Sequence, residues 1–426
     1  MCESNHFCIK KWQLPTISSI FSSKIYYNIT MNSNIEKLYQ IAAKSDRLII
    51  GLMSGTSLDG LDVALCKFYG SGTDTIIEVL HFDTVPFTKE TKTEIRKIFA
   101  KKTIQFQDLC LLNAWIGNLH GEIVLNCLHN WNVLPQNIDL IASHGQTVFH
   151  APKILHGLQK FPNATLQIGD GDHIATKTGI ITVSDFRQKH CAAGGEGAPL
   201  AVYGDYLIFS KENEDRILLN IGGIANFTFL AGNLDANKVY ATDTGTGNTL
   251  IDAYVEKYFD LPFDKNAEIA SLGIVNSKLS AELLNDSFFE KLYPKTTGPE
   301  LFNLEYLKKA QAKSKTTALA HSDVLATLCK FSAETIALGI LQLQSLAQVI
   351  YCSGGGIHNP LIMRFLNELL PDFKFKKTNE LKISADAKEA VLFATLANEA
   401  IAGGKTNFGT KKGVPSISMG KISFAK

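Results

Sequence analysis

The sequence contains one arrangement twice: a short apolar run meets a glycine-rich turn and continues as a second apolar run. The first copy reads RLIIGL, MSGTSLDG and LDVALCKF from residue 47, and the second reads RILLNI, GGIAN and FTFL from residue 216. Apolar runs on both sides of glycines predict two strands joined by a tight turn. Each half also has a later strand that ends in small residues, IDLIASHGQT and AQVIYCSGGGIHN. This duplication predicts two similar α/β lobes with a ligand cleft between them.

Breaks in this pattern divide the 426 residues into four segments. The polar run SKENED separates a first lobe, expected over 47–210, from a second lobe over 211–384. The stretch ADAKEAVLFATLANEAI has apolar residues at helical spacing. We therefore expect 385–426 to be a C-terminal helix and tail that pack back on the first lobe. Residues 1–46 are expected to be an N-terminal extension, either disordered or helical.

Composition narrows the class of partner. Hydrophobic residues make up 45% of the chain, charged residues 19%, and the net charge is +1. Such a balance gives no general attraction to nucleic acid or to an anionic membrane. The chain contains no run of about 18 apolar residues, so we do not expect a membrane-spanning helix. The eight cysteines form no C-x-x-C pair and are scattered through apolar stretches, which favours reduced, buried thiols over disulfides or a zinc site. We expect a cytoplasmic protein with a small-molecule substrate, without nucleic-acid or membrane partners; a homodimer stays open.

Four glycine-rich turns follow predicted strands. Glycine lets backbone N–H groups approach an anion closely, so such turns suit phosphate. A single turn of this kind is more simply a tight turn, but four at strand ends in two matching halves favour a nucleotide site. The sequence has no G-x-x-x-x-G-K-[ST] motif, which disfavours a P-loop enzyme. The turns are Ser54–Ser57, Gly222–Gly223, Asp243–Gly247 and Gly354–Gly356.

Three carboxylates, Asp59, Asp62 and Asp243, lie in or beside these turns. Beside a phosphate, a carboxylate is useful as a ligand of Mg²⁺, directly or through water. Each can instead cap a turn through its side chain. For Asp59 both interpretations stay open, while the TDTGTGN context favours the metal or water role for Asp243. No side chain is assigned as a direct metal ligand.

The stretch VSDFRQKHCAAGGEGAPL places Asp185 at the end of an apolar strand, followed by Arg187 and a flexible loop. A carboxylate at a strand end can act as a general base or hold a substrate hydroxyl. An Asp–Arg ion pair that only fixes the loop agrees equally well with the spacing. His144, in ASHGQTVFH, is either an acid, a base or a sugar contact, or a structural histidine.

Together these segments resemble anhydro-N-acetylmuramic acid kinases. The matching segments follow that family's order from about residue 47 to 420: GLMSGTSLDGLDVAL, SHGQTVFH, TLQIGD, DFRQKHCAAGGEGAPL, LNIGGIAN, DTGTGN, PKTTGPELFN, DVLATL, SGGGIHNP and DAKEAVLFA. The family belongs to the sugar kinase, hsp70 and actin ATPase superfamily. The resemblance therefore implies an α/β fold of two similar lobes of the actin-like ATPase (ribonuclease H-like) type with a central interlobe cleft, and ATP and Mg²⁺ as cofactors.

The resemblance also implies a reaction. Water opens the bridge of 1,6-anhydro-N-acetylmuramic acid at the anomeric carbon, and the freed O6 takes the γ-phosphoryl group of ATP. The product, N-acetylmuramic acid 6-phosphate, belongs to peptidoglycan recycling. The alternatives are another sugar or acid kinase of the same superfamily and a catalytically silent nucleotide-binding sensor. The presence of HGQT and DFR argues against another kinase, and the intact Asp185 argues against a silent sensor.

Residue roles follow from the matching motifs. Asp185 resembles the base that activates water, and we group His144, Gln146, Thr147 and Arg187 with the sugar pocket. The expected nucleotide contacts are Gly55, Thr56, Ser57, Leu58, Asp59, Gly60, Leu61 and Asp62 in the first turn; Asn220, Gly222, Gly223, Asp243, Gly245 and Gly247 in the second lobe; and Gly354, Gly355, Gly356, His358 and Asn359 on the adenosine side. The family usually has an acid at His190 and glutamine at Glu196, which are expected to flank the sugar.

Overall fold

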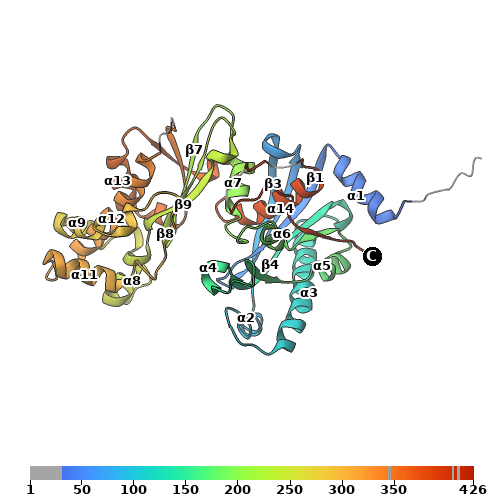
Figure 1. Ribbon diagram of the computed structural model, residues 1–426, viewed down its shortest axis with the longest axis horizontal. Coiled ribbons are helices and arrows are strands. Elements are labelled where there is room, and N and C mark those ends of the chain that lie inside the picture. Colours follow the sequence, from blue (N-terminus) through green and yellow to red (C-terminus); the bar gives the residue numbers. More distant parts are fainter. Residues whose placement is uncertain (1–30, 344, 346, 405–406, 410–412) are drawn as a thin grey trace, which may run out of the picture.

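The computed structural model describes residues 31–343, 345, 347–404, 407–409 and 413–426. Figure 1 shows two groups of sheets and helices side by side, one built mainly from the N-terminal half and the other from the middle of the chain. The expectation for the first 30 residues lies outside the described residues. Residues 33–43 of the predicted extension form a helix.

The first lobe is built on a seven-stranded sheet. Its strands are β1 (Asp46–Ser54), β2 (Gly60–Tyr69), β3 (Ile76–Pro86), β4 (Leu140–Ala151), β5 (Ala164–Ile168), β6 (Thr182–Ser184) and β12 (Lys421–Ser423). They lie in the order β12-β6-β4-β1-β2-β3, with β5 also paired to β4. Strands β1, β4 and β6 are parallel, whereas β2 and β3 continue from β1 as an antiparallel meander.

The second lobe repeats this plan with five strands. They are β7 (Arg216–Ile221), β8 (Ile224–Leu230), β9 (Tyr240–Thr246), β10 (Val349–Ser353) and β11 (Lys374–Lys377), in the order β11-β10-β7-β8-β9. Strands β7, β8 and β9 form an antiparallel meander, as β1, β2 and β3 do in the first lobe. Strand β10 pairs in parallel with β7, and β11 pairs in parallel with β10. The predicted duplication and the ribonuclease H-like fold class are confirmed. The limits of the two lobes along the chain stay a prediction.

Helices cover both sheets. They are α1 (Ser33–Ala43), α2 (Lys89–Arg96), α3 (Phe106–Asn130), α4 (Lys153–His156), α5 (Gly171–Thr178), α6 (Phe186–Ala192), α7 (Ala201–Phe209), α8 (Thr249–Phe259), α9 (Ser277–Leu284), α10 (Ser287–Glu290), α11 (Leu304–Ser314), α12 (His321–Leu341), α13 (Pro360–Leu369) and α14 (Lys388–Ile401). Helices α8, α9, α11, α12 and α13 share one core with the second sheet, and α3 and α5 share another with the first.

The alternation of side chains along β1 places this strand between two cores. Ile49 and Met53 belong to the core shared with α14, and Ile50 belongs to the core under α3. A Cβ on Gly51 would lie 2.8 Å from the carbonyl carbon of Ala390, so the glycine lets α14 approach the strand closely. The C-terminal helix therefore packs on the first sheet.

Helices α7 and α14 join the two lobes. Their core includes Leu218 and Leu230 of the second sheet as well as residues of the first. The buried carboxylate of Asp205 on α7 pairs with Lys388 of α14 at 2.7 Å and accepts a hydrogen bond from Thr228 of β8 at 2.7 Å. This contact links α7, α14 and the second sheet.

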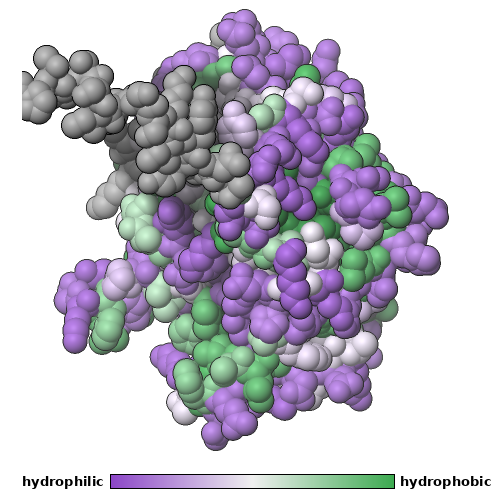
Figure 2. Space-filling view, turned by 90° about the vertical axis from the view of Figure 1, so that its right-hand side faces the viewer, coloured by the Kyte–Doolittle hydropathy of each residue, from purple (hydrophilic) through white to green (hydrophobic). Residues whose placement is uncertain are grey.

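Helix α12 is, among the described helices, the single one long and apolar enough to cross a membrane by length and composition. In its most apolar window 78% is buried in the second lobe, as in the core helix of a globular domain. The six cysteines of the described chain are all free, and five of them are buried. Cys110 is exposed, so the expectation of buried thiols is wrong for this residue. Figure 2 shows mostly hydrophilic side chains on the outer side of the first lobe, with smaller apolar patches.

Candidate functional site

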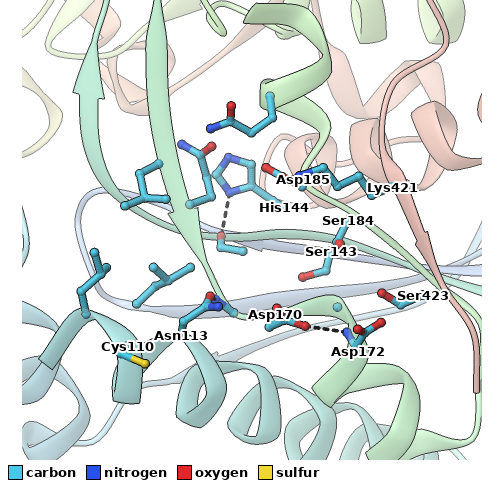
Figure 3. A pocket seen from close by; sticks show the side chains of 18 of the residues that line it. Cys110, Asn113, Ser143, His144, Asp170, Asp172, Ser184, Asp185, Lys421 and Ser423 are labelled. Atoms are coloured by element: carbon cyan, nitrogen blue, oxygen red, sulfur yellow. Dashed lines mark hydrogen bonds and ion pairs between the residues drawn. The ribbon is translucent and has the colours of Figure 1, made fainter. Parts of the chain in front are cut away.

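A cavity of about 720 Å³ opens in the first lobe beside the carboxyl end of β6. Strands β4, β6 and β12 and helices α3 and α5 contribute to its wall. Figure 3 shows Asp185, His144 and Lys421 on one side and Asn113 with Asp170 on the other. All residues that line it belong to the first lobe, so the turns of the second lobe do not form part of its wall. The candidate base thus lies in a first-lobe cavity, whereas the sequence predicts an interlobe site.

Asp185 lies at the junction between β6 and α6. Its backbone is left-handed (φ +59°), a conformation that Asp and Asn tolerate better than most residues. Its carboxylate Oδ2 accepts a hydrogen bond from the ammonium group of Lys421 in an ion pair. Asp185 keeps 25% of its side-chain surface exposed and Lys421 keeps 69%. No sequence motif points to Lys421, because it lies 236 residues further along the chain than Asp185.

His144 is buried and has both ring nitrogens engaged. Arg187 donates its Nε–H to Nε2 of His144 at 2.8 Å, so the ring proton belongs on Nδ1, which lies 2.8 Å from the carbonyl oxygen of Gly145. Burial, together with the charge of Arg187, lowers the pKa of His144 to about 3. The imidazole is therefore neutral at pH 7 and fixes Arg187, as a structural histidine would.

Arg187 fastens the glycine-rich loop that follows α6. Its second donor reaches the carbonyl oxygen of Gly197 at 2.7 Å, while its Nε–H is held by His144. The alternative of an ion pair between Asp185 and Arg187 is not what the structure shows, because Asp185 pairs with Lys421 instead. Arg187 nevertheless fixes the loop, through a backbone carbonyl.

Gln146 ties the first glycine turn to β4. Its amide nitrogen donates to the carbonyl oxygen of Gly55 at 3.0 Å, and its amide oxygen accepts from Ser54 at 2.6 Å. Thr147 next to it accepts a hydrogen bond from Gln167 at 3.2 Å. Gln146 is fully buried, and through these two hydrogen bonds it holds the first glycine turn against β4, the strand that contributes His144 to the cavity wall.

The first turn exposes some of the predicted nucleotide residues and buries others. Thr56, Ser57 and Asp59 are exposed. Leu58 and Leu61 are buried in the core under α3, so only their backbone is available to a ligand. On β2, Asp62 accepts a hydrogen bond from Thr84 at 2.6 Å, and burial raises its pKa.

The structure brings the second-lobe turns together. The backbone N–H of Gly247 donates to the carbonyl oxygen of Gly223 at 2.8 Å, and that of Asn248 to Gly222 at 2.9 Å. The turn at Gly354–Gly356 packs against Ile221, at the end of β7. Three turns far apart in the sequence thus share one edge of the second sheet.

The glycines of these turns fall into two groups. A Cβ on Gly55 would meet no protein atom closer than 3.8 Å, one on Gly222 would meet Asn220 at an ordinary 3.5 Å, and one on Gly355 would meet nothing within 4 Å. At the others an added Cβ would press on neighbouring protein atoms: Gly60, Gly223, Gly245, Gly247, Gly354 and Gly356. The first group leaves open space at the turns, which a phosphate could fill.

The adenosine-side residues divide in the same way. His358 is exposed. Asn359 directly precedes α13, and its amide oxygen accepts hydrogen bonds from the N–H groups of Leu361 and Ile362, both at 3.0 Å. Its amide oxygen is therefore occupied as a helix cap, a role that the sequence analysis did not assign to it. Asn220 lies at the end of β7, paired in register with Ser353.

Asp243 fits a magnesium–nucleotide complex. Its Oδ2 accepts from the backbone of Thr297 at 2.9 Å, and burial raises its pKa. The described residues give Oδ1 no partner, and they contain no cluster of three His, Cys, Asp or Glu side chains that could hold a metal. Mg²⁺ commonly takes one or two carboxylates and completes its shell with phosphate and water, so a lone carboxylate beside the turns suits it.

His190 lies under the glycine-rich loop and does not line the cavity. Its Nδ1 accepts from the backbone N–H of Gly197 at 2.9 Å, and burial lowers its pKa to about 4. A Cβ on Gly195 would collide with the imidazole ring. His190 thus shapes the loop, while Glu196 is exposed.

Two ribonuclease H-like sheets with glycine turns at matching strand ends, and an aspartate at the edge of a cavity, define a two-lobed protein of the actin-like ATPase class. The chain matches the family described as anhydro-N-acetylmuramic acid kinase over residues 47–423. It belongs to this family.

Relatives named anhydro-N-acetylmuramic acid kinase align with this chain over their full length. An anhydro-N-acetylmuramic acid kinase from Pseudoalteromonas atlantica is 56% identical over 401 residues, which cover 92% of this chain and 100% of the relative. The one from Caldanaerobacter subterraneus subsp. tengcongensis is 38% identical, with 91% and 100% covered. Among solved structures, a hexokinase of the ROK type from Thermus thermophilus aligns with a TM-score of 0.32 and 12% identity, over 82% of this chain and 96% of that one.

Proposed function

We propose that this kinase acts on 1,6-anhydro-N-acetylmuramic acid with ATP and Mg²⁺. Water attacks the anomeric carbon and the bond from that carbon to O6 breaks. O6 then receives the γ-phosphoryl group, giving ADP and N-acetylmuramic acid 6-phosphate, and the proton of the water passes to Asp185. The product would enter peptidoglycan recycling in the cytoplasm. The names of the relatives support this substrate.

The observation that carries the proposal is the placement of Asp185. It lines the cavity, it is fixed at a strand end, and one carboxylate oxygen is held by Lys421. The other oxygen is left to accept a proton, which a general base requires. The freed O6 needs no base of its own, because bond cleavage supplies its charge.

The turns supply the nucleotide side of the proposal. Open space at Gly55, Gly222 and Gly355 would let backbone N–H groups meet phosphate oxygens. Mg²⁺, held by phosphate, water and Asp243, would neutralise charge on the phosphates. Because the second-lobe turns do not line the cavity, we propose that the lobes close to bring ATP to the sugar, which also keeps stray water from the phosphates.

The source of the new oxygen tests the proposal. In ¹⁸O-labelled water, quenched before the sugar exchanges its anomeric oxygen, the product sugar should carry the label and the transferred phosphoryl group should not. Label in inorganic phosphate with unlabelled sugar would show idle ATP hydrolysis and contradict the proposal. N-acetylmuramic acid, which has no bridge to open, is the matched control and should give little product.

A further inference from the structure

The candidate base has a single side-chain partner. Asp185 occupies the position before the first residue of α6, but its carboxylate caps no backbone N–H of that helix. Within the described part of the chain, Lys421 is the one hydrogen-bond and ion-pair partner of this carboxylate. Figure 3 shows the lysine side chain running along the cavity rim to the aspartate.

The position of Lys421 is itself well determined. Strand β12 pairs antiparallel with β6, and Lys421 lies opposite Ser184, the residue before the base. Before it, Met419 is buried at 3% exposure, and Gly420 has φ +105°, a conformation that favours glycine. A Cβ on Gly420 would lie 2.5 Å from Val183, so the tail lies flat on β6.

Stability does not explain this lysine. Its side chain is 69% exposed, and ion pairs between exposed groups contribute little to folding, commonly 0–1 kcal/mol. The β12–β6 pairing and the burial of Met419 hold the tail without it. Removal of the ammonium group therefore leaves the fold intact and changes what the carboxylate of Asp185 faces.

We infer that Lys421 is a positioning residue: from the last strand of the chain, it holds the carboxylate of Asp185 so that the second oxygen faces the attacking water. This inference rests on the proposed function, because it gives the base a fixed direction. A base misplaced by about 1 Å can cost up to about a hundredfold in rate. A carboxylate that is free to rotate but still samples the correct direction should lower the rate by less than a hundredfold.

The test compares Lys421→Met, Lys421→Arg and Asp185→Asn. We expect Lys421→Met to lower kcat about tenfold, with the KM for ATP and for the anhydro sugar within threefold, and with an unchanged melting temperature. Lys421→Arg should restore kcat to within threefold of the original, because it returns a cation to the same rim. Lys97→Met is the matched control: it removes another exposed lysine that pairs with a carboxylate, Glu94, at 2.5 Å, and it should change nothing.

A double variant separates positioning from other roles. If Lys421 acts through Asp185, then Lys421→Met should cause no further loss in a chain that already carries Asp185→Asn. A full additional loss there would overturn the inference. So would a raised KM for ATP with normal kcat, since that would make the lysine a phosphate contact.

The inference and the proposed function fail in different ways. Unchanged kcat in Lys421→Met, alongside an inactive Asp185→Asn, would overturn the inference alone. Full activity of Asp185→Asn would show that Asp185 is not the base, and would overturn both the proposed role of Asp185 and the inference about Lys421.

Discussion

Replacing Gly55 with alanine should separate a ligand contact from a packing contact within one hairpin. The nearest protein atom to an added Cβ at this position is 3.8 Å away, and the backbone does not need the left-handed region that favours glycine. Alanine also restricts the unfolded chain, so we expect the free energy of unfolding to stay the same or to rise by about 0.4–1 kcal/mol. ATP should bind at least tenfold more weakly, a cost of about 1.4 kcal/mol, because the methyl group takes the space of a phosphate oxygen.

Gly60, at the other end of the same turn, provides the matched control. There an added Cβ would collide with the carbonyl group of Val85 and lie 2.9 Å from Cα of Pro86, so β3 would have to move. Overpacking of this kind commonly costs about 1–3 kcal/mol. Gly60→Ala should therefore lose stability, and Gly55→Ala should not. The assays are denaturant unfolding without ligand, and calorimetry with a non-hydrolysable ATP analogue.

Two results would contradict this reasoning. Normal affinity for the analogue in a folded Gly55→Ala protein would mean that no phosphate approaches the first turn. Normal stability of Gly60→Ala would mean that the strand spacing yields more easily than the contact with Val85 implies. Gly245 is a poorer choice for the ligand test, because a Cβ there would lie 2.9 Å from the hydroxyl of Thr335 and would disturb packing as well.

Three further predictions concern the base, the buried histidines and the N-terminus. Asp185→Asn, which keeps a residue that tolerates the left-handed backbone, should lower turnover at least about a hundredfold and leave ATP affinity within threefold; turnover within threefold of the original would assign the base elsewhere. Burial lowers the pKa values of His120, His144 and His190 to about 4, 3 and 4 from 6.5, so the unfolded chain protonates first as the pH falls. The contribution of these histidines to the free energy of unfolding should be fully present above pH 6.5 and should decline towards pH 4 by about 1 kcal/mol per pH unit for each histidine. Equilibrium unfolding at pH 7.5 and at pH 5 measures this decline, and equal free energies of unfolding at the two pH values would contradict it. A chain that begins at Met31 should match the full chain in melting temperature and turnover, and a clear loss in either would show that the first 30 residues pack on the protein or a partner.

Local patterns were enough to predict the duplicated architecture. In both copies the apolar runs on either side of the glycines form a hairpin, β1–β2 and β7–β8, and each hairpin belongs to one of the two similar sheets. The motifs could not show which atoms of a turn are accessible to a ligand. Leu58 and Leu61 match the nucleotide motif, yet the side chains of both are buried in the core under α3. Leu61 lies on the buried face of β2, whereas Leu58 lies in the turn before β2 and has a left-handed backbone (φ +59°).

Roles that depend on distant partners were beyond local reasoning. Gln146 and His144 lie in one motif, but one clamps the Gly55 turn and the other fixes Arg187, contacts that only the fold creates. Asn359 was an exception that the sequence could have resolved, since asparagine before proline at the start of a helix is a cap signal. Lys421 meets Asp185 only after β12 has joined the sheet, so no spacing rule could connect them.

The return of the chain to its first sheet affects how the protein is made. The first lobe lacks the cover of α14 and the edge strand β12 until these two elements have been synthesised, whereas the strands of the second sheet all fall within Arg216–Lys377. Because domains fold as their residues become available, the second lobe can form its core before the first lobe, which is completed only by α14 and β12. During that interval the nascent chain exposes the edge of β6, a surface on which other strands can pair. Chains truncated late in the gene should therefore aggregate through the first lobe.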